Sequence, residues 1–510
     1  MIKNFHIAHP FLFAVLPAVF LWGQNFGEVP IREVFPALIV FIIFGALAWG
    51  FFWIFFRDFE KSAAVTSAFL IVTLFFGYIY EIFFYNSFIK LRFLSAFIIL
   101  FVIITGIGVL IKKTKKDLYN LNKIITITIG IFILLSLFQV ITGYYNSYTD
   151  KQHSDVEVIV GTNDNKNKLR DIYYIVLDGY SSPDVISSVM GFKEINQTVN
   201  SLEQKGFFVA SESKSNYPGT LLSLPSSLNM RYLEDPSAHK IHFTLAENHK
   251  AKDFLKSQGY KYLHFGADAF TYFNRYADEN INLGLFSPYQ TAVWHNTIFR
   301  PIQDLSDTRF DRLAEKFGFL DRDLTQWKRE KFKLKKLAEV PGKESSPVFA
   351  FAHFLVPKGA NVFDENGDFL TKEEADERGV IKNYLGHVAY INKEVESLVD
   401  TILENSDHEP IIVIQGDHGF PFWGYRDVIE EFDKPELAKE LIVPGKYSFP
   451  IFNAYYFPDG GDKLLYDSVS PVNTFRILLN YYFGQDLELL DDTSYTADPD
   501  DSSKFIIWDK

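Results

Sequence analysis

Five long apolar stretches fill the first part of the chain. They cover residues 10–23, 34–56, 63–85, 93–111 and 124–143. Each is close to the ~20 residues that an α-helix needs to cross a bilayer, so we interpret them as five transmembrane helices. The first is not a cleavable signal peptide, because further apolar stretches follow it instead of a small-residue cleavage site.

Shorter apolar runs, rich in β-branched and aromatic residues, alternate with helical patterns in the rest of the chain. The runs predict strands at 171–177, 207–210, 260–265, 348–355, 411–415 and 449–457. The patterns predict helices at 184–205, after Thr220, and at 247–257, 304–340 and 372–404. This alternation favours an α/β domain with a mostly parallel sheet flanked by helices. The expected division is a five-span transmembrane domain at 1–145, a polar linker at 146–168 and the α/β domain at 169–510.

The basic residues between the apolar stretches predict the orientation of the five helices. Eight would lie on one side and three on the other: Lys3, Arg57, Lys61, Lys112, Lys113, Lys115, Lys116 and Lys123, against Arg32, Lys90 and Arg92. Because cytoplasmic loops carry an excess of Lys and Arg, the N-terminus is expected inside. Five crossings then place the α/β domain outside.

Composition and charge support this division. The chain is 48% hydrophobic with 52 Phe in 510 residues, which is unusually apolar for a soluble protein. The first 149 residues carry a net charge of +5, so the total of −13 leaves −18 for the remainder. An acidic outer domain argues against nucleic acid as a partner. The chain has no cysteine, so no disulfide can stabilise that domain.

Acidic residues follow two of the predicted buried strands. Asp178 comes directly after the run 172–177, and Asp417 and His418 follow the run 411–415. In open α/β sheets, ligands bind beyond the carboxyl ends of the strands. We therefore expect these side chains to converge although they lie far apart in sequence.

A threonine hydroxyl is expected at the start of a helix. Pro218 and Gly219 break the chain just before Thr220, and we place Pro225 in the first helical turn. The free N–H groups and the dipole of a helix N-terminus suit a phosphoryl group. Because a threonine hydroxyl is a poor nucleophile unaided, such a site needs a metal or a base.

Each signal also has an ordinary structural explanation, since an Asp-Gly pair is usually a turn and a Thr before a helix is usually an N-cap. Their order along the chain is what favours a site. Asp178, Thr220, Asp417 and His418 would bind one divalent ion. Three oxygens and one nitrogen suit Zn or Mn better than Ca.

This order resembles the alkaline phosphatase and sulfatase superfamily, and Thr220-Leu-Leu-Ser-Leu-Pro-Ser resembles the nucleophile motif of membrane phosphoethanolamine transferases and lipoteichoic acid synthases. The resemblance covers roughly residues 170 to 495. It implies a sulfatase-like fold with Thr220 as the phosphorylated nucleophile and Asp178, Asp417 and His418 as the remaining metal ligands.

The chain departs from that pattern at three points. Lys358, after the run that contains His353, stands where relatives have a histidine beside the metal. No histidine for a second metal follows Gly419, so we expect one tightly bound ion. The absence of cysteine also differs from the phosphoethanolamine transferases, which are usually disulfide-rich.

Three other polar residues keep two explanations each, and a fourth, His387, keeps one. Lys358 would bind a phosphate oxygen or be a solvated loop lysine, and Arg426 would clamp a phosphate or pair with Asp427. Glu81, near the outer end of the third span, would contact substrate or lie at the interface. His387 is expected on the exposed flank of its helix without a catalytic role.

The resemblance implies a two-step phosphotransfer in the bacterial cytoplasmic (inner) membrane. A phosphoglycerol or phosphoethanolamine group would pass from a phospholipid donor to Thr220 and then to an envelope glycan or lipid acceptor. One rival is an extracytoplasmic phosphodiesterase or sulfatase-like hydrolase, although a sulfatase needs a Cys/Ser-x-Pro-x-Arg context that Thr220 lacks. The other is an inactive membrane scaffold. We expect a monomer.

Overall fold

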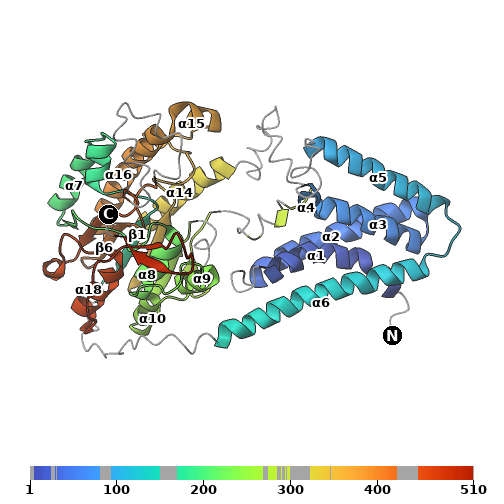
Figure 1. The fold of residues 1–510 in the computed structure, drawn as a ribbon, viewed down its shortest axis with the longest axis horizontal. Coiled ribbons are helices and arrows are strands. Elements are labelled where there is room, and N and C mark those ends of the chain that lie inside the picture. Colours follow the sequence, from blue (N-terminus) through green and yellow to red (C-terminus); the bar gives the residue numbers. More distant parts are fainter. Residues whose placement is uncertain are drawn as a thin grey trace. The chain divides into compact units, whose positions relative to one another are not determined.

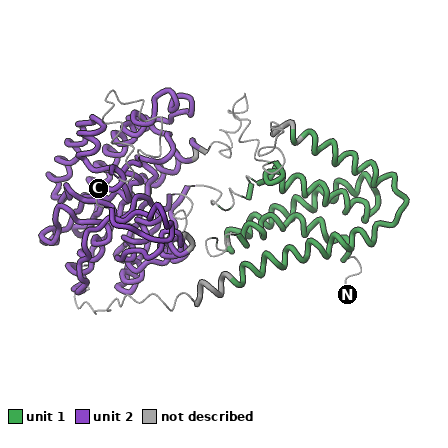
Figure 2. Tube along the Cα trace, viewed as in Figure 1, with its two compact units in different colours: residues 1–156, 285–321 green, residues 157–284, 322–510 purple. Residues whose placement is uncertain are grey.

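The computed structural model describes residues 5–24, 29, 31–80, 93–149, 169–267, 274–283, 289, 293–294, 296–298, 322–344, 346–421 and 446–508. The chain divides into two compact units (Figure 2). Unit 1 comprises residues 1–156 and 285–321, and unit 2 comprises residues 157–284 and 322–510. Each is described separately below.

Unit 1 is a bundle of helices (Figure 1). Its elements are η1 (Phe5–Ile7), α1 (His9–Gln24), α2 (Ile31–Phe56), α3 (Phe59–Leu74), α4 (Phe76–Tyr80), α5 (Phe93–Lys113) and α6 (Tyr119–Thr149). The buried imidazole of His9 on α1 contacts Ser67 of α3 at 2.6 Å and Asn122 of α6 at 3.2 Å. This polar contact ties three helices together inside an apolar bundle.

The prediction of five spans is not confirmed. All five apolar stretches overlap helices, but in the described part of the chain only Glu33–Phe56 and Tyr119–Thr142 are long and apolar enough to cross a membrane. α1 and α3 have 16 residues each, or about 24 Å, which is shorter than a ~30 Å hydrocarbon core. Residues 81–92, which contain Glu81, lie outside the described residues.

The long helices of unit 1 expose many large apolar side chains. Leu47 of α2, Leu110 of α5 and Leu134 of α6 are each about two-thirds exposed. Only 17% of each spanning segment is buried inside the protein. Exposed apolar surface on this scale marks a contact with membrane or protein.

A segment from the later part of the chain belongs to unit 1. Residues 285–321 group with its helices, although the sequence assigned them to the α/β domain. Tyr289 is buried in the same core as Phe41. The Gly77 N–H donates to the Asn296 carbonyl at 3.0 Å, and a Cβ at Gly77 would lie 2.8 Å from the Asn296 Cα. The close approach of these two backbones therefore requires glycine.

Unit 2 is built on a mostly parallel sheet, as predicted. Within its described part, the strand order is β2-β7-β6-β1-β5-β3-β4, with β2 and β7 antiparallel to their neighbours. The strands are β1 (Ile172–Leu177), β2 (Phe208–Val209), β3 (Lys261–Phe265), β4 (Glu279–Asn280), β5 (Val348–Phe354), β6 (Ile411–Gly416) and β7 (Asn453–Tyr456). β1, β5 and β6 are buried along their whole length, as central parallel strands require.

Helices cover both faces of this sheet (Figure 1). They are η5 (Val185–Val189), α7 (Ile195–Gln204), α8 (Thr220–Asn229), α9 (His239–Glu247), α10 (Lys250–Ser257), α14 (Arg322–Ala338), α15 (Lys372–Arg378), α16 (Val380–Asn405), η10 (Gly461–Leu464) and α18 (Pro471–Phe483). Alternate residues of β1 pack with α7, α14 and α16 on one face and with α8, α10 and α18 on the other. The central strand thus lies between two apolar cores.

Two predicted helices are interrupted at glycines. The predicted helix at 184–205 is a π-helical turn, η5, followed by Gly191 and then α7. The predicted helix at 372–404 is divided into α15 and α16 by Gly379. Gly191 has φ +81° and Gly379 has φ +82°, which glycine adopts without the steric cost of a side chain.

The expected position of Pro225 in α8 was wrong. α8 begins at Thr220 itself, so Pro225 lies in its second turn rather than its first. Proline has no N–H, so the Leu221 carbonyl receives no helical hydrogen bond from it. Met230, with φ 57°, then ends the helix.

A C-terminal hairpin that the sequence did not predict supports the turn before α8. β8 (Tyr495–Ala497) pairs with β9 (Phe505–Ile507). The buried Tyr217 ring lies 5.0 Å from Phe505, and the Tyr217 hydroxyl accepts from the Leu233 N–H at 2.7 Å. These contacts fix the chain just ahead of Thr220.

The chain has no cysteine, so one introduced thiol reports the side of the membrane on which it lies. Asn405→Cys, at the exposed end of α16, should react with an impermeant thiol reagent in intact spheroplasts. Lys115→Cys, in the exposed loop between α5 and α6, should react only after lysis. Labelling of Asn405→Cys only after lysis would place unit 2 in the cytosol.

Candidate functional site

The register of the parallel strands brings the predicted acidic residues together. Leu177 of β1 is paired with Gly416 of β6, so the next residues along the two strands are Asp178 and Asp417. The Gly179 N–H donates to Asp417 Oδ1 at 2.9 Å. Asp178 is 6% exposed and Asp417 is 3% exposed. Two carboxylates therefore lie side by side at the buried edge of the sheet.

Gly179 makes the turn after β1 possible. Its φ is +68°, and a Cβ there would lie 2.5 Å from the Cβ of Lys358. The Lys358 N–H donates to the Asp178 carbonyl at 2.9 Å. The chain that follows β5 is thus packed directly against the turn, which requires glycine at this position.

Thr220 is the first residue of α8 and faces the two strand ends. Its Oγ1 lies 3.4 Å from Asp178 Oδ1 and 3.4 Å from His418 Nε2. The first N–H groups of a helix have no acceptor within the helix, so this end of α8 favours an anion. The Asn216 side chain holds the preceding turn by donating to Ser470 Oγ and to the Thr493 carbonyl, each at 3.0 Å.

The orientation of His418 suits a metal ligand. Its Nδ1 lies 2.7 Å from the Gly419 carbonyl, an acceptor, so Nδ1 carries the proton. Nε2 then presents its lone pair towards Asp178 and Thr220. A backbone carbonyl that fixes the tautomer of a ligating histidine is a common feature of metal sites.

The spacing of these atoms fits one divalent ion. Donor atoms of Asp178, Asp417 and His418 all lie within 4.8 Å of one another. His418 Nε2 lies 3.3 Å from Asp178 Oδ1 and 3.8 Å from Asp417 Oδ2. Ligands of a tetrahedral ion with bonds of about 2.0 Å are separated by about 3.3 Å. Asp417 Oδ2 is buried and accepts no hydrogen bond in the described part of the chain, so the site has a place for a cation.

Lys358 extends its ammonium group into the same site. Nζ lies 3.1 Å from His418 Nε2 and 3.5 Å from Asp178 Oδ1. Burial alone would raise the pKa of Asp178, but the ammonium group of Lys358 beside it holds that pKa below its ordinary value. Asp178 is therefore ionised at neutral pH. The structure places Lys358 among the proposed metal ligands rather than on a solvated loop.

His353 and His387 lie near this site, and the sequence assigned no role there to either. His353 is buried near the end of β5, and burial lowers its pKa although Asp417 and Asp178 oppose the shift. His387 is fully buried, so the prediction of an exposed residue was wrong. Its Nδ1 lies 2.8 Å from the Pro357 carbonyl, next to Lys358, because α16 packs beneath that loop.

A buried ion pair on α14 contacts the end of β5. Lys333 Nζ lies 3.0 Å from Glu330 Oε1 and donates to the His353 carbonyl at 2.6 Å. Both side chains are 1% exposed. Burial raises the pKa of Glu330, while Lys333 opposes the shift. The spacing of Glu330 and Lys333 on α14 is the only signal of this pair in the sequence.

One predicted site residue lies outside the described part of the chain. Arg426 falls within residues 422–445, so its predicted contact with substrate stays a prediction. Asp178, Thr220, Lys358, Asp417 and His418 are all described and meet at one place. Their catalytic and metal-binding roles remain proposals.

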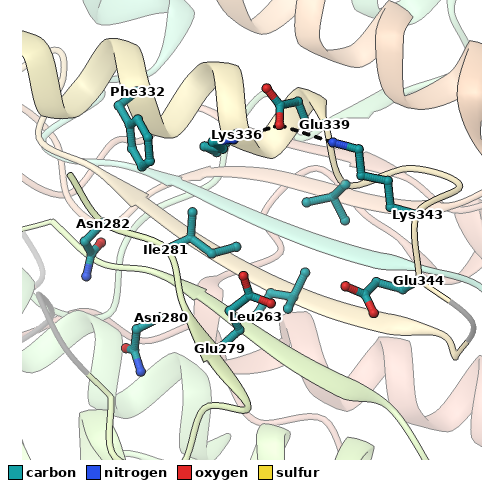
Figure 3. Close-up of a pocket in the computed structure, with 11 residues that line it drawn as sticks. Leu263, Glu279, Asn280, Ile281, Asn282, Phe332, Lys336, Glu339, Lys343 and Glu344 are labelled. Atoms are coloured by element: carbon teal, nitrogen blue, oxygen red, sulfur yellow. Dashed lines mark hydrogen bonds and ion pairs between the residues drawn. The ribbon is translucent and has the colours of Figure 1, made fainter.

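A separate cleft of about 390 Å³ lies between β3, β4 and α14 (Figure 3). Its charged side chains compensate one another. Glu339 pairs with Lys336 at 2.9 Å and with Lys343 at 3.2 Å. The lining residues Glu279 and Glu344 pair with Lys261, which lies outside the lining. Neither Thr220 nor any of the four residues gathered around it lines this cleft.

Comparison with known proteins finds similarity in solved structures. No family model and no curated protein sequence matches the chain. The C-terminal periplasmic domain of EcEptC from Escherichia coli, in complex with Zn, is 14% identical with a TM-score of 0.43, over 68% of this chain and 94% of that one. Lipooligosaccharide phosphoethanolamine transferase A (EptA) from Neisseria meningitidis, an integral membrane protein, is 12% identical with a TM-score of 0.40, over 93% and 95%.

A sulfatase is also similar. BT1596, a 2-O GAG sulfatase, is 13% identical with a TM-score of 0.37, over 63% of this chain and 72% of that one. All three similarities are weak in sequence, at 12% to 14% identity. At such identities and TM-scores they do not by themselves assign a function to this chain.

The geometry predicts about one tightly bound Zn or Mn ion per chain. Asp417→Asn keeps an oxygen that can accept from Gly179 and His418 but removes the charge of the unpaired Oδ2. Because changes around a ligand already cost 10- to 100-fold in metal affinity, loss of the ligand should cost at least about 100-fold. Metal analysis after dialysis and titration calorimetry measure this.

Asp184→Asn is the matched control, since Asp184 is exposed and lies in the same part of unit 2. Its metal content should equal that of the wild type. Undiminished binding by Asp417→Asn would contradict the ligand set, and two tight ions in the wild type would require a second site.

Proposed function

We propose that unit 2 is a metal-dependent phosphotransferase with Thr220 as its nucleophile. The donor is a membrane phospholipid, the transferred group is phosphoglycerol or phosphoethanolamine, and the acceptor is an envelope glycan or lipid. The observation that carries the proposal is the position of Thr220 Oγ1 at the start of α8, 3.4 Å from both Asp178 Oδ1 and His418 Nε2. A hydroxyl, an anion-binding helix end and a metal ligand set are the parts that phosphoryl transfer needs.

The reaction has two steps. Thr220 Oγ1 attacks the donor phosphorus, the bond from phosphorus to the diacylglycerol oxygen breaks, and a phospho-substituted threonine forms. The threonine proton leaves to solvent, and diacylglycerol takes a proton from solvent. An acceptor hydroxyl then attacks the phosphorus, and the bond from phosphorus to Thr220 Oγ1 breaks. The acceptor proton leaves to solvent, and Thr220 Oγ1 takes a proton from solvent, which regenerates the hydroxyl.

The residues around Thr220 have different roles in these two steps. Asp178, Thr220, Asp417 and His418 would hold the divalent ion. When bound, that ion supplies Lewis-acid chemistry, lowering the pKa of the hydroxyl and neutralising phosphoryl charge. The N–H groups at the start of α8 bind a phosphoryl oxygen, and Lys358 contributes a positive charge beside it.

Unit 1 fits a lipid substrate. Its long helices expose apolar side chains, which we assign to contact with the bilayer. We propose a location in the bacterial cytoplasmic membrane, with the N-terminus inside and unit 2 outside. The outer leaflet of the same membrane would then supply the phospholipid donor.

The same site would make a hydrolase if water replaced the acceptor hydroxyl. Direct attack by water on the donor needs no threonine adduct, whereas both the transferase and a hydrolase that uses a phospho-enzyme require one. The state of Thr220 therefore separates these mechanisms.

Thr220→Ser and Thr220→Val test the nucleophile, because Ser keeps a hydroxyl and Val keeps the branched shape without it. After incubation with mixed phospholipids and metal, the wild type and Thr220→Ser should carry a head-group adduct at residue 220. Thr220→Val should carry none and should release diacylglycerol at least about 1000-fold more slowly. Mass spectrometry of the intact protein and a diacylglycerol assay measure the two effects.

Release of diacylglycerol by Thr220→Val at the wild-type rate would contradict the covalent mechanism. The adduct could also break down at a rate that no glycan or lipid acceptor increases, with water as the only acceptor of the group. This result would identify a hydrolase. Thr401→Val, at a partly buried residue near the end of α16 that is not among the five residues of the site, is a control that should behave as the wild type.

A further inference from the structure

Lys358 approaches the atoms that the metal site would use. Its Nζ lies 3.1 Å from His418 Nε2, the nitrogen whose lone pair faces the site, and 3.5 Å from Asp178 Oδ1. These two atoms are themselves 3.3 Å apart. The ammonium group therefore contacts the same two atoms that the proposed ion would bind.

The two cations cannot occupy these positions together at low cost. An ion bound to both atoms at about 2 Å would lie within about 4 Å of the ammonium nitrogen. Repulsion between charges of +2 and +1 at that distance is well above thermal energy, even at the effective dielectric constant of a protein site. The lone pair of Nε2 can also serve only one of them.

The backbone of Lys358 is fixed, but its side chain is long and partly exposed. Its N–H is bonded to the Asp178 carbonyl, its Cβ packs on Gly179, and His387 holds the preceding carbonyl of Pro357. The side chain is nevertheless 28% exposed, in contrast to 9% for Asp178 and 1% for His418. Rotation about the side-chain bonds alone can withdraw the ammonium group from the ligands.

We propose that Lys358 is an internal counter-ion of the metal-free site and that a divalent ion displaces its ammonium group from Asp178 and His418. This inference rests on the metal site of the proposed function. In the metal-free protein, Lys358 compensates the buried charge of Asp178 and Asp417. In the metal-bound protein, the displaced ammonium group is available to a phosphoryl oxygen.

Lys358→Met tests the displacement in the purified full-length protein in detergent. Loss of the competing charge-assisted hydrogen bond should tighten binding of Mn or Zn by about 10- to 100-fold, measured by calorimetry against a chelator. After treatment with EDTA, Lys358→Met should melt at a lower temperature than the wild type, because two buried carboxylates lose their counter-ion. At saturating metal this difference should disappear or reverse.

Two further variants serve as controls. Lys214→Met removes a lysine whose ammonium group lies over the Trp508 ring instead, and its metal affinity should equal that of the wild type. Lys358→Gln keeps a donor for His418 Nε2 without the charge, so its affinity should lie between those of the wild type and Lys358→Met. It also provides the test if Lys358→Met does not fold.

The outcomes separate this inference from the proposed function. Equal or weaker metal binding by the Lys358 variants would overturn the inference and leave the metal site intact. Binding by Lys358→Met but not by the wild type would support the inference and overturn metal dependence of the proposed function. Absence of binding in every variant would overturn both.

Discussion

The pairing of β1 with β6 forces two carboxylates together at a buried edge. With Leu177 opposite Gly416, Asp178 and Asp417 cannot be separated without shifting the register of the central sheet. A one-residue shift would move every side chain of β1 to the opposite core, so packing on both faces maintains the register. Buried charges of like sign are costly unless positive groups approach them. The rest of the site follows from that requirement.

Charge balance indicates when such a site can accept an anion. Two carboxylates and the ammonium group of Lys358 together carry a formal net charge of −1. A divalent ion bound there, as in the proposed function, would change this formal charge to +1. A phosphodiester would then be attracted to the metal-bound site and repelled from the metal-free one. The start of α8 adds its partial positive charge in both states.

Much of this architecture could be predicted from local pattern. The apolar runs at β1, β5 and β6 identify buried parallel strands, and ligand sites lie beyond the carboxyl ends of such strands, which led to Asp178, Asp417 and His418. The start of α8 followed from the Pro-Gly break before Thr220. These signals are local because each depends only on residues adjacent in sequence.

Features that depend on tertiary contacts could not be predicted in this way. The burial of His387 depends on how α16 packs beneath the Pro357 carbonyl, and its sequence neighbours do not encode that contact. The short hairpin β8–β9 exists because it packs on Tyr217. The assignment of residues 285–321 to unit 1 depends on burial of Tyr289 among distant helices. Five spans were predicted from hydropathy, which does not reveal that α1 and α3 are too short.

The site combines rigid ligands with one adjustable cation. Asp417 Oδ1 accepts from the Gly179 and His418 N–H groups, and the Lys333 and Glu330 pair holds the end of β5, so the ligand-bearing backbone is fixed by contacts outside the site. Lys358 alone among these residues combines a fixed backbone with a long, partly exposed side chain. A histidine at this position would be shorter and less mobile, and it would add a ligand instead of a competing charge. In the proposed site, lysine at this position would therefore supply a positive charge that has to move before the metal is bound, instead of the additional ligand that a histidine would supply.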